Sequence, residues 1–486
     1  MRSNQTRKLI YGLIIVALFG AMFQYSEWLN RVKKDKDLGE AAIGQIDTGS
    51  FMLKLALLGG ARGVAANVLW NRAEEYKKEQ DWDKMATTVD LITKLQPHFL
   101  SVWTFQGWNL AYNVSVEWDA PEDKYEWIKK GIKFLEDGVR KNKKSPDLIW
   151  DTAWTYYHKI GFADEAIILR KLFRDDSDEE FKTYDDPDTG NRVVGNDNYI
   201  LGWAWFRKSI DLADAGNARV ANTTEANLDY VDPTPQRKGR PGDLAFRSMP
   251  AHARTRYALS LEKASMVDVP ATFGEVAQNA WAKALDEWVR FGEFEFEAFN
   301  DPKRRMVRLD DSTNMERFSK LSETQQHWTN RWADQMNYRY WKDRCVAEKT
   351  TQGVEARRLF YEGTLAYKTA AFDRAVEKFR DGLNLWNTLL KTHKDYRNDD
   401  FNKKDTGLIA KRYIRSLRQL GEPEPKDMPF RDLLPAAEMD TSLDPFDATE
   451  MLPSKRVQPG APPRQPARPA ARPAATSPLI APPPAR

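Results

Sequence analysis

The apolar residues between Ala65 and Tyr112 recur three and four positions apart, a spacing that places them on one face of a helix. A polar stretch at 80–83 separates two such series, and Pro97 ends the second. The two series are Leu69, Ala73 and Tyr76, and then Met85, Val89 and Ile92. The stretch therefore predicts a helical hairpin, and a new helix is expected to begin near Ser101.

Equivalent positions in this stretch lie 34 residues apart. Leu69 and Trp103 are bulky residues at that distance, and Ala73 and Gly107 are small ones. The pattern resembles the tetratricopeptide repeat, in which a small residue at position 8 lets helix A touch helix B closely. The first hairpin departs from the family pattern, because Arg72 stands where leucine is usual and larger residues replace two small ones at Met85 and Ile92.

A second match to the same repeat lies at residues 355–386. With Ala356 at position 1, five signature positions are filled correctly, namely Leu359, Gly363, Ala375, Phe379 and Gly382. Helical patterns also cover 119–144, 147–161 and 163–173, the last two as the helices of a third repeat, and in 250–293 the series Ala277, Trp281 and Ala284 repeats the small, aromatic, small spacing. The predicted fold class is therefore all-α, a TPR-like helical-hairpin solenoid.

Other segments interrupt this pattern. Residues 175–198 are polar and are expected to form a solvated loop, since their spacing does not fit a calcium loop. Residues 217–249 are rich in Pro and Gly and indicate an irregular insertion. Polar and apolar residues alternate in 293–299, as in a short strand, but no partner strand is evident. The pattern in 314–348 predicts one long helix.

The N-terminus predicts a membrane anchor. Residues 9–25 form an apolar run with Gln24 as its one polar residue, and basic residues precede it. A cleaved signal is the alternative, but Gly20 and Ala21 do not make a good cleavage site. We expect a single-pass membrane protein whose soluble body is extracytoplasmic, and basic residues on both sides of the run leave its orientation to be measured.

The composition changes again near the C-terminus. Residues 451–486 contain 11 Pro and six Lys or Arg and no acidic residue, which is typical of a disordered tail with polyproline II character. The predicted organisation is a transmembrane signal anchor (1–29), a linker (30–50), a TPR-like domain (51–292), a helical region containing the second hairpin (293–420), and a Pro-rich disordered tail (421–486).

The sequence shows no motif for catalysis, for a metal or for a cofactor. Its five histidines are scattered singly, its one cysteine, Cys345, has no partner for a disulfide, and nucleotide-binding and nucleophile-elbow motifs are absent. A net charge of +3, with basic and acidic residues interspersed, gives no reason to expect nucleic acid as a partner. Most of the 17 Trp lie at helical spacing, which favours core packing. We therefore expect a protein without enzyme activity or cofactor.

Repeat proteins of this kind usually bind partners through the A helices, at positions 2, 5, 9, 12 and 13. The residues predicted to lie there, as a groove for a protein or peptide, are Asn67, Trp70, Glu74, Thr104, Trp108, Tyr112, Asp151, Thr155 and His158. The Lys and Asn clamp that some family members use for C-terminal carboxylates is absent, because Trp70 and Glu74 stand at those positions.

Residues 50–300 also resemble membrane-anchored helical-repeat envelope proteins of planctomycete-type bacteria, some of which are labelled iron-responsive element. The likeness rests on the segments LGGARGVAANVLWNRAEEYKKEQDW, LQPHFLSVWTFQGWNLAYNVSVEW and RKLFRDD. It implies the architecture, whereas no residue cluster for iron accompanies the label. The expected function is a membrane-anchored protein-protein interaction scaffold. The alternative is an envelope enzyme or glycan-binding protein that uses clustered Trp and acidic residues.

Overall fold

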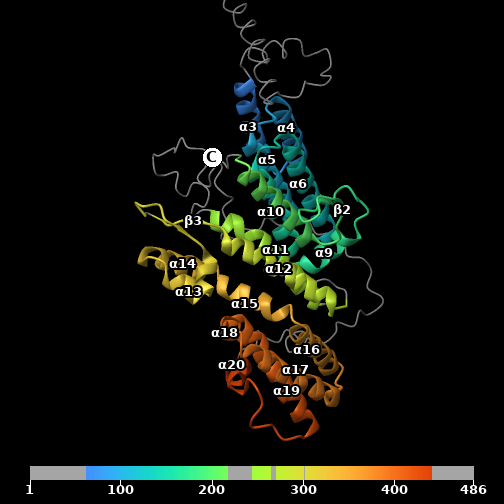
Figure 1. The fold of residues 1–486 in the computed structure, drawn as a ribbon. Helices are drawn as coiled ribbons and strands as arrows, with labels where there is room; N and C mark the ends of the chain where they lie inside the picture. The colour runs from blue at the N-terminus through green and yellow to red at the C-terminus, as the bar shows by residue number, and fades with distance from the viewer. Residues whose placement is uncertain (1–61, 217–242, 264–269, 300, 440–486) are drawn as a thin grey trace, which may run out of the picture. The chain divides into compact units, whose positions relative to one another are not determined.

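The computed structural model describes residues 62–216, 243–263, 270–299 and 301–439 (Figure 1). The chain divides into two compact units, Met1–Thr155 and Tyr156–Arg486. The predicted anchor at 9–25, the linker at 30–50 and the Pro-rich segment 451–486 lie outside the described residues. Within those residues, no helix combines the length and the apolar character that crossing a bilayer requires.

The described part of the first unit, hereafter unit 1, consists of helices alone, as the sequence predicts. Successive helices pair as antiparallel hairpins, and a π-helix and a 3-10 helix connect α5 to α6. The elements are α3 (Arg62–Lys78), α4 (Trp82–Leu95), α5 (Leu100–Trp108), the π-helix η2 (Asn109–Val114), the 3-10 helix η3 (Ser115–Glu117), α6 (Pro121–Lys141), α7 (Pro146–Trp154) and the start of the π-helix η4 (Thr155–Lys159).

Local sequence explains where these helices begin. The Asp81 carboxylate accepts a hydrogen bond from the Lys84 backbone N–H at 3.2 Å and caps α4. Pro121 and Pro146 stand in the first turns of α6 and α7, where a missing N–H costs nothing. Ser145 accepts from the Leu148 N–H and completes the cap of α7.

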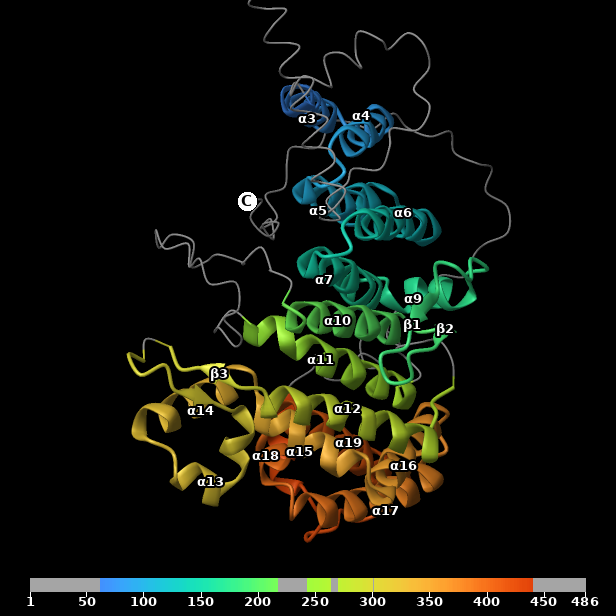
Figure 2. The same cartoon turned by 45° about the horizontal axis from the view of Figure 1, so that its top comes forward.

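Unit 1 has two rows of helices. Figure 2 shows α3, α5 and α7 in one row and α4 and α6 in the other. The Trp70 ring on α3 meets the Phe105 ring on α5 edge to face, with centroids 4.9 Å apart. In the other row, Phe134 of α6 packs against the apolar cluster that contains Met85 of α4. The predicted A helices are therefore neighbours along one side of the unit.

Glycines allow the helices of unit 1 to approach closely. A Cβ added at Gly107 on α5 would come 2.4 Å from Leu135 Cγ on α6, and one added at Gly138 would come 2.8 Å from the Trp103 ring. No such contact can be accommodated without movement. The predicted close approach of helix A to helix B at Gly107 is thus confirmed.

The second unit, hereafter unit 2, is also mainly helical. Its helices α10, α11 and α12 pack one after another, α12 also packs on α15, and α17 packs on both α16 and α19. One antiparallel two-stranded ribbon precedes α10, and another lies between α12 and α13. The elements are α8 (Ile160–Phe162), α9 (Ala166–Asp175), β1 (Thr183–Asp185), β2 (Arg192–Val194), α10 (Asn198–Asp214), α11 (Asp243–Glu262), α12 (Glu275–Glu293), β3 (Phe296–Glu297), β4 (Met306–Val307), η6 (Leu309–Thr313), α13 (Met315–Ser319), α14 (Glu323–Gln335), α15 (Tyr338–Glu348), α16 (Thr351–Lys368), α17 (Phe372–Leu390), α18 (Lys394–Asn398), α19 (Asp400–Leu420), η7 (Arg431–Leu433) and α20 (Leu434–Met439).

The turn that connects α16 to α17 has the same geometry as the turn that connects α3 to α4. The turn residues Ala370 and Gln80 are both left-handed, with φ of 56° and 57°. The next N–H in each turn, of Ala371 and of Asp81, donates over 2.9 Å to a carbonyl five residues earlier. These turns lie 290 residues apart in the sequence, as do Gly363 and Ala73. The register that the sequence predicts for the two hairpins is therefore reproduced in their backbone.

Unit 2 buries four tryptophans completely, and each indole N–H has a partner. Three of the acceptors lie on a neighbouring helix of the same bundle, and the fourth lies on the helix packed against α17. The donor and acceptor pairs are Trp203 with Glu287, Trp281 with Glu262, Trp288 with Thr255, and Trp386 with Thr406. The predicted role of Trp281 and Trp288 in core packing is confirmed.

The structure differs from the sequence predictions in four places. A ribbon, β1–β2, lies inside the predicted loop 175–198. The strand predicted at 293–299 is β3, and β4 is its partner through Phe296 opposite Val307. The predicted single helix 314–348 is three helices, because Ser322 forms a capping box and Asn337 is left-handed. The disordered tail was predicted to begin at residue 421, but Phe430 and Leu434 belong to the core.

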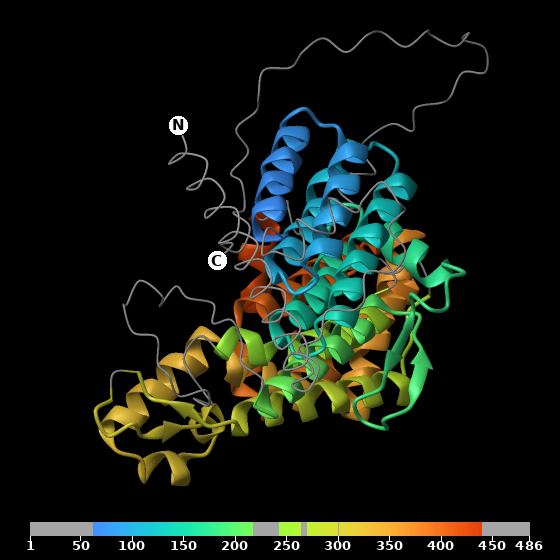
Figure 3. The ribbon, with the colours of Figure 1, turned by 90° about the horizontal axis from the view of Figure 1, so that it is seen from above.

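Two of the three helices in 314–348, α13 and α14, belong to a small module. Its elements are β3, β4, η6, α13 and α14, and Figure 3 shows it in dark yellow beside the other helices of unit 2. Asp310 joins the module to α15, because its carboxylate accepts from the Tyr338 hydroxyl at 2.9 Å and pairs with Lys342 and Arg317. The module is thereby fixed to the bundle by buried polar contacts.

Candidate functional site

The candidate site is the outer side of α3, α5 and α7 in unit 1, which we call the A-helix face. Trp70 on α3 contacts Phe105 on α5, and the Lys77 ammonium lies 4.6 Å from the centroid of the same ring. On the other side of α5, the Thr104 hydroxyl donates to the Asp151 carboxylate of α7 at 3.0 Å. Five of the nine residues predicted from the sequence make side-chain contacts within or between these helices and η2: Trp70, Thr104, Trp108, Tyr112 and Asp151.

Aromatic rings occupy much of the A-helix face. Trp108 and Tyr112 lie nearly parallel, with ring centroids 5.7 Å apart and planes 13° apart. Trp150 and Trp154 on α7 repeat this arrangement at 5.4 Å and 8°. The Trp154 indole hydrogen-bonds to Tyr112, and burial raises the pKa of the Tyr112 hydroxyl. All four rings are half-buried, so each keeps part of its surface exposed.

Trp150 and Trp154 were not among the predicted site residues. The prediction for α7 used a register in which Asp151 and Thr155 face outward. In the structure, Ile149 and Ala153 are a bulky and a small buried residue four apart on α7, as Trp103 and Gly107 are on α5. Trp154 therefore corresponds to Trp108, one position away from Thr155. The recurrence of Trp immediately after the small residue is the signal that could have identified it.

The remaining predicted residues have different environments. Asn67 is exposed, and Glu74 is half-buried on the same helix. Thr155 is 3% exposed and donates to the Asp151 carbonyl, so its side chain points into the unit. His158 belongs to unit 2, where it stacks on Phe162 with centroids 5.7 Å apart, and burial lowers the pKa of its imidazole.

A polar stripe lies on the buried side of α5. Gln106 is 1% exposed, and neither polar atom of its side chain has a hydrogen-bond partner. One turn further on, Asn109 is fully buried, contacts the Met85 sulfur at 3.7 Å and accepts from Asn113. The stripe continues into the π-helix η2, a type of distortion that is frequent at functional sites.

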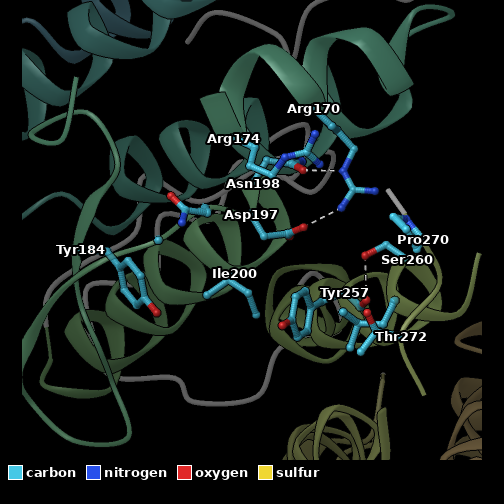
Figure 4. Close-up of a pocket in the computed structure, with 13 residues that line it drawn as sticks. Arg170, Arg174, Tyr184, Asp197, Asn198, Ile200, Tyr257, Ser260, Pro270 and Thr272 are labelled. Atoms are coloured by element: carbon cyan, nitrogen blue, oxygen red, sulfur yellow. Dashed lines mark hydrogen bonds and ion pairs between the residues drawn. The ribbon is translucent and has the colours of Figure 1, made fainter. Parts of the chain in front are cut away.

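Unit 2 contains a separate cavity of about 350 Å³, shown in Figure 4. Its walls come from α9, the β1–β2 ribbon, the start of α10, the end of α11 and residues 270–272. Arg170 donates to Asn198 Oδ1 at 2.9 Å and to Asp197 Oδ2 at 2.6 Å, and its guanidinium lies 4.3 Å from the Tyr199 ring centroid. The buried cation is therefore already balanced by a carboxylate of the same wall, and none of the sequence-predicted residues lines the cavity.

Unit 2 also contains a buried charge cluster. The Glu348 carboxylate is fully buried, accepts from Arg357 Nη2 at 2.7 Å and from the Tyr396 hydroxyl. Glu262 lies beside this pair and accepts from the Trp281 indole at 2.8 Å. Burial raises the pKa of Glu262 to about 8, and the neighbouring Glu348 charge adds to that effect. The cluster connects α11 with α15, α16 and α18, and its carboxylates are out of reach of a substrate.

Among the residues that the structure describes, no group of three or more His, Cys, Asp or Glu side chains is placed to hold a metal ion. Cys345 is fully buried, and burial raises the pKa of its thiol, which disfavours the reactive thiolate. Comparison with known proteins found no matching family model, and no curated sequence with significant similarity. The A-helix face is therefore the feature from which a function can be argued.

Proposed function

We propose that the chain is a scaffold of TPR-like helical hairpins that binds a partner protein or peptide through the A-helix face. The observation that carries the proposal is the alignment of α3, α5 and α7, which puts half-buried aromatic rings beside hydrogen-bonding groups on one side of unit 1. Such a mixture suits protein recognition, because aromatic rings bury much apolar area and polar groups set the orientation.

Assignment to the tetratricopeptide type is part of the proposal. Its support is the recurrence of one contact pattern in hairpins far apart in the sequence. Gly107 packs on Leu135 in one hairpin, and Gly363 packs on Phe379 in another. In each case a small residue of the first helix meets a bulky residue of the second, which is the contact that defines the repeat.

The proposal also places the scaffold at a membrane. The support is the sequence alone, through the apolar run at 9–25 and the basic residues before it. Protease digestion of intact cells and of spheroplasts tests the expected extracytoplasmic location. Digestion of the body in spheroplasts and protection in intact cells is expected, whereas protection in both would place the body on the cytoplasmic side.

Site-specific photo-crosslinking tests the binding role. A photoreactive phenylalanine derivative is introduced at Asn67 or at Trp108 on the A-helix face, and at Leu91 on α4 as a control that is 46% exposed. In native membranes, a discrete adduct is expected from the first two positions and not from Leu91. The same adduct from all three positions, or from none, would contradict the proposal.

A matched charge variant makes the test specific. Glu74→Gln changes a polar group of the A-helix face, and Asp90→Asn changes an exposed carboxylate on α4 that pairs with Lys94. The first substitution is expected to reduce the adduct formed at Asn67, and the second to leave it unchanged. The glycan-binding alternative predicts retention of the purified protein on an immobilised cell-wall polymer, with no protein adduct.

A further inference from the structure

The wall of the unit 2 cavity contains polar groups that hold one another in place. Arg170 is bound by the Asp197 carboxylate and the Asn198 side-chain oxygen. The second oxygen of Asp197 accepts from the Tyr199 N–H at 2.9 Å and caps α10, and the Asn198 amide donates to the Tyr156 carbonyl at 3.0 Å. Because these contacts lie within the wall, they fix this side of the cavity before any ligand enters.

Backbone contacts fix two further segments of the wall. The Gly195 N–H, just after β2, donates to the Lys182 carbonyl at 2.9 Å, and a Cβ added at Gly195 would come 2.9 Å from the Tyr184 ring. The Thr272 N–H donates to the Leu261 carbonyl at 2.6 Å, which ties its segment to the end of α11. The cavity is therefore preformed, as small-molecule sites usually are.

Three hydroxyl groups of the lining make no hydrogen bond to any of the described residues. They belong to Tyr184 on β1, to Tyr257 on α11 and to Thr272, all of them half-buried. Figure 4 shows Tyr184 and Tyr257 on opposite sides of Ile200. Burial raises the pKa of both phenols, so both remain neutral donors at physiological pH. Each hydroxyl can donate and accept, which suits a ligand with several hydroxyl groups.

The charges of the lining favour an acidic ligand. The lining contains two guanidiniums, of Arg170 and Arg174, and one carboxylate, of Asp197, so its net charge is +1. Arg170 and Asp197 balance each other, and the remaining charge is that of Arg174 in the last turn of α9. Its Nε lies 3.4 Å from the Asp175 carboxylate, which is 58% exposed, and solvent screens such a pair. A carboxylate or phosphate binds a guanidinium through two parallel hydrogen bonds.

The size of the cavity limits the ligand to about one sugar ring. Its volume of about 350 Å³ is at the lower end of small-molecule sites. At about 30 Å³ for each water-sized group, it accommodates roughly a dozen non-hydrogen atoms. Ile200, Leu261 and Pro270 add apolar surface to the lining, against which the carbon atoms of a ring can pack.

We propose that this cavity binds an acidic monosaccharide. The hydroxyl groups of the ligand pair with Tyr184, Tyr257 and Thr272, and its acidic group, a carboxylate or a phosphate, pairs with Arg174. This small-molecule site in unit 2 goes beyond the proposed function, which concerns the A-helix face of unit 1. Either proposal can therefore fail without the other.

Isothermal titration calorimetry of the purified full chain in detergent tests the proposal. The probes are glucuronate, galacturonate and glucose 6-phosphate, with glucose as the sugar that lacks an acidic group and acetate as the acid that lacks hydroxyl groups. At least one of the acidic sugars is expected to bind with a Kd below about 1 mM, and glucose and acetate at least about tenfold more weakly. The ranking of the sugar acids against the sugar phosphate identifies the acidic group. Absence of binding by all three acidic sugars, or equally tight binding of acetate, would overturn the proposal.

Substitutions assign the binding to this cavity. Tyr184→Phe and Tyr257→Phe each remove one hydroxyl and keep the ring, and each is expected to raise the Kd about three- to tenfold. Arg174→Gln is expected to raise the Kd of the acidic sugar about tenfold or more and to leave that of glucose unchanged. Tyr367→Phe, on α16 and outside the lining, is the matched control and is expected to change nothing.

Circular dichroism and thermal unfolding show whether each variant keeps the parent fold. An unchanged Kd in folded Tyr257→Phe and Arg174→Gln variants would place the binding elsewhere and overturn the proposal. A rise in Kd as large in Tyr367→Phe as in Tyr257→Phe would also contradict it. Crosslinking at the A-helix face is unaffected by these results, because it reports on unit 1 alone.

Discussion

Gly363 on α16 and Phe379 on α17 lie in direct contact, so that a Cβ added at Gly363 would come 2.7 Å from Phe379 Cδ1. The Phe379 ring is fully buried and has no free space to move into. Gly363→Ala is therefore expected to lower the free energy of unfolding of unit 2 by about 1–3 kcal/mol. Chemical denaturation followed by circular dichroism measures it.

A second glycine provides the control for that substitution. Gly63 on α3 is in a helix too, but an added Cβ would have Gln96 Nε2 as its nearest neighbour at 3.5 Å, an ordinary contact. Gly63→Ala is expected to be neutral or to stabilise by up to about 1 kcal/mol through helix propensity. If both variants were equally stable, the close contact at Gly363 would not be part of the fold.

Replacement of Gln106 is expected to give an unusual gain in stability. Its side chain is buried in unit 1 with both polar atoms unpaired, which costs about 1–3 kcal/mol for each such group. Gln106→Leu is therefore expected to leave stability unchanged or to raise it, although the substitution removes a polar group. Thermal unfolding measures the effect. A loss of more than about 1 kcal/mol would indicate that the amide is paired in solution.

Because the pKa of Glu262 is raised in the folded protein, we expect stability to fall as the pH rises. Burial, followed by the Glu348 charge, raises its pKa to about 8 in the folded protein, above the ordinary value of 4.5. The folded state therefore binds a proton that the unfolded state has lost between pH 4.5 and 8. The stabilisation is complete below pH 4.5 and is lost as the pH rises through about 8.

A single substitution isolates this effect. Glu262 is expected to contribute a slope of up to about 1.4 kcal/mol per pH unit to the free energy of unfolding in that window. Glu262→Gln keeps the hydrogen bond to the Trp281 indole and removes the titration, so the slope should decrease by this amount and stability at pH 8 should rise. Denaturation curves at pH 5, 6.5 and 8 measure both. An unchanged slope would show that Glu262 titrates normally.

The sequence predicted the hairpins whose connections are short. In α3–α4 and α16–α17 the small and bulky residues follow each other at the family spacing, and a left-handed residue stands at the same turn position in both, Gln80 and Ala370. In the hairpin α5–α6, the equivalent positions of the second helix were harder to identify from the sequence. Gly131 follows Gly107 by 24 residues, whereas Ala375 follows Gly363 by 12. In α6, Gly131, Leu135 and Gly138 have the same spacing as Ala375, Phe379 and Gly382 in α17. A fixed period of 34 residues does not identify them, because the connection between α5 and α6 is longer.

The choice of candidate site residues depended on the same register. On α5 the period of 34 selected Thr104, whose hydroxyl donates to Asp151 of α7, and Trp108, whose ring stacks on that of Tyr112. On α7 the longer connection shifted the register by one residue, which exchanged Trp154 for the buried Thr155. The β3–β4 pairing also could not be predicted, because each strand has two residues and the pattern of so short a strand carries little information.

Oxidative labelling of tryptophan tests most directly whether the A-helix face is the binding surface. Labelling of Trp108 and Trp154 in native membranes is compared with that of the purified protein, and Trp118, which is 41% exposed in unit 1, is the reference. The account predicts a several-fold loss of labelling at Trp108 and Trp154 in membranes, with Trp118 unchanged. Equal labelling of Trp108 and Trp154 in the two preparations would contradict it.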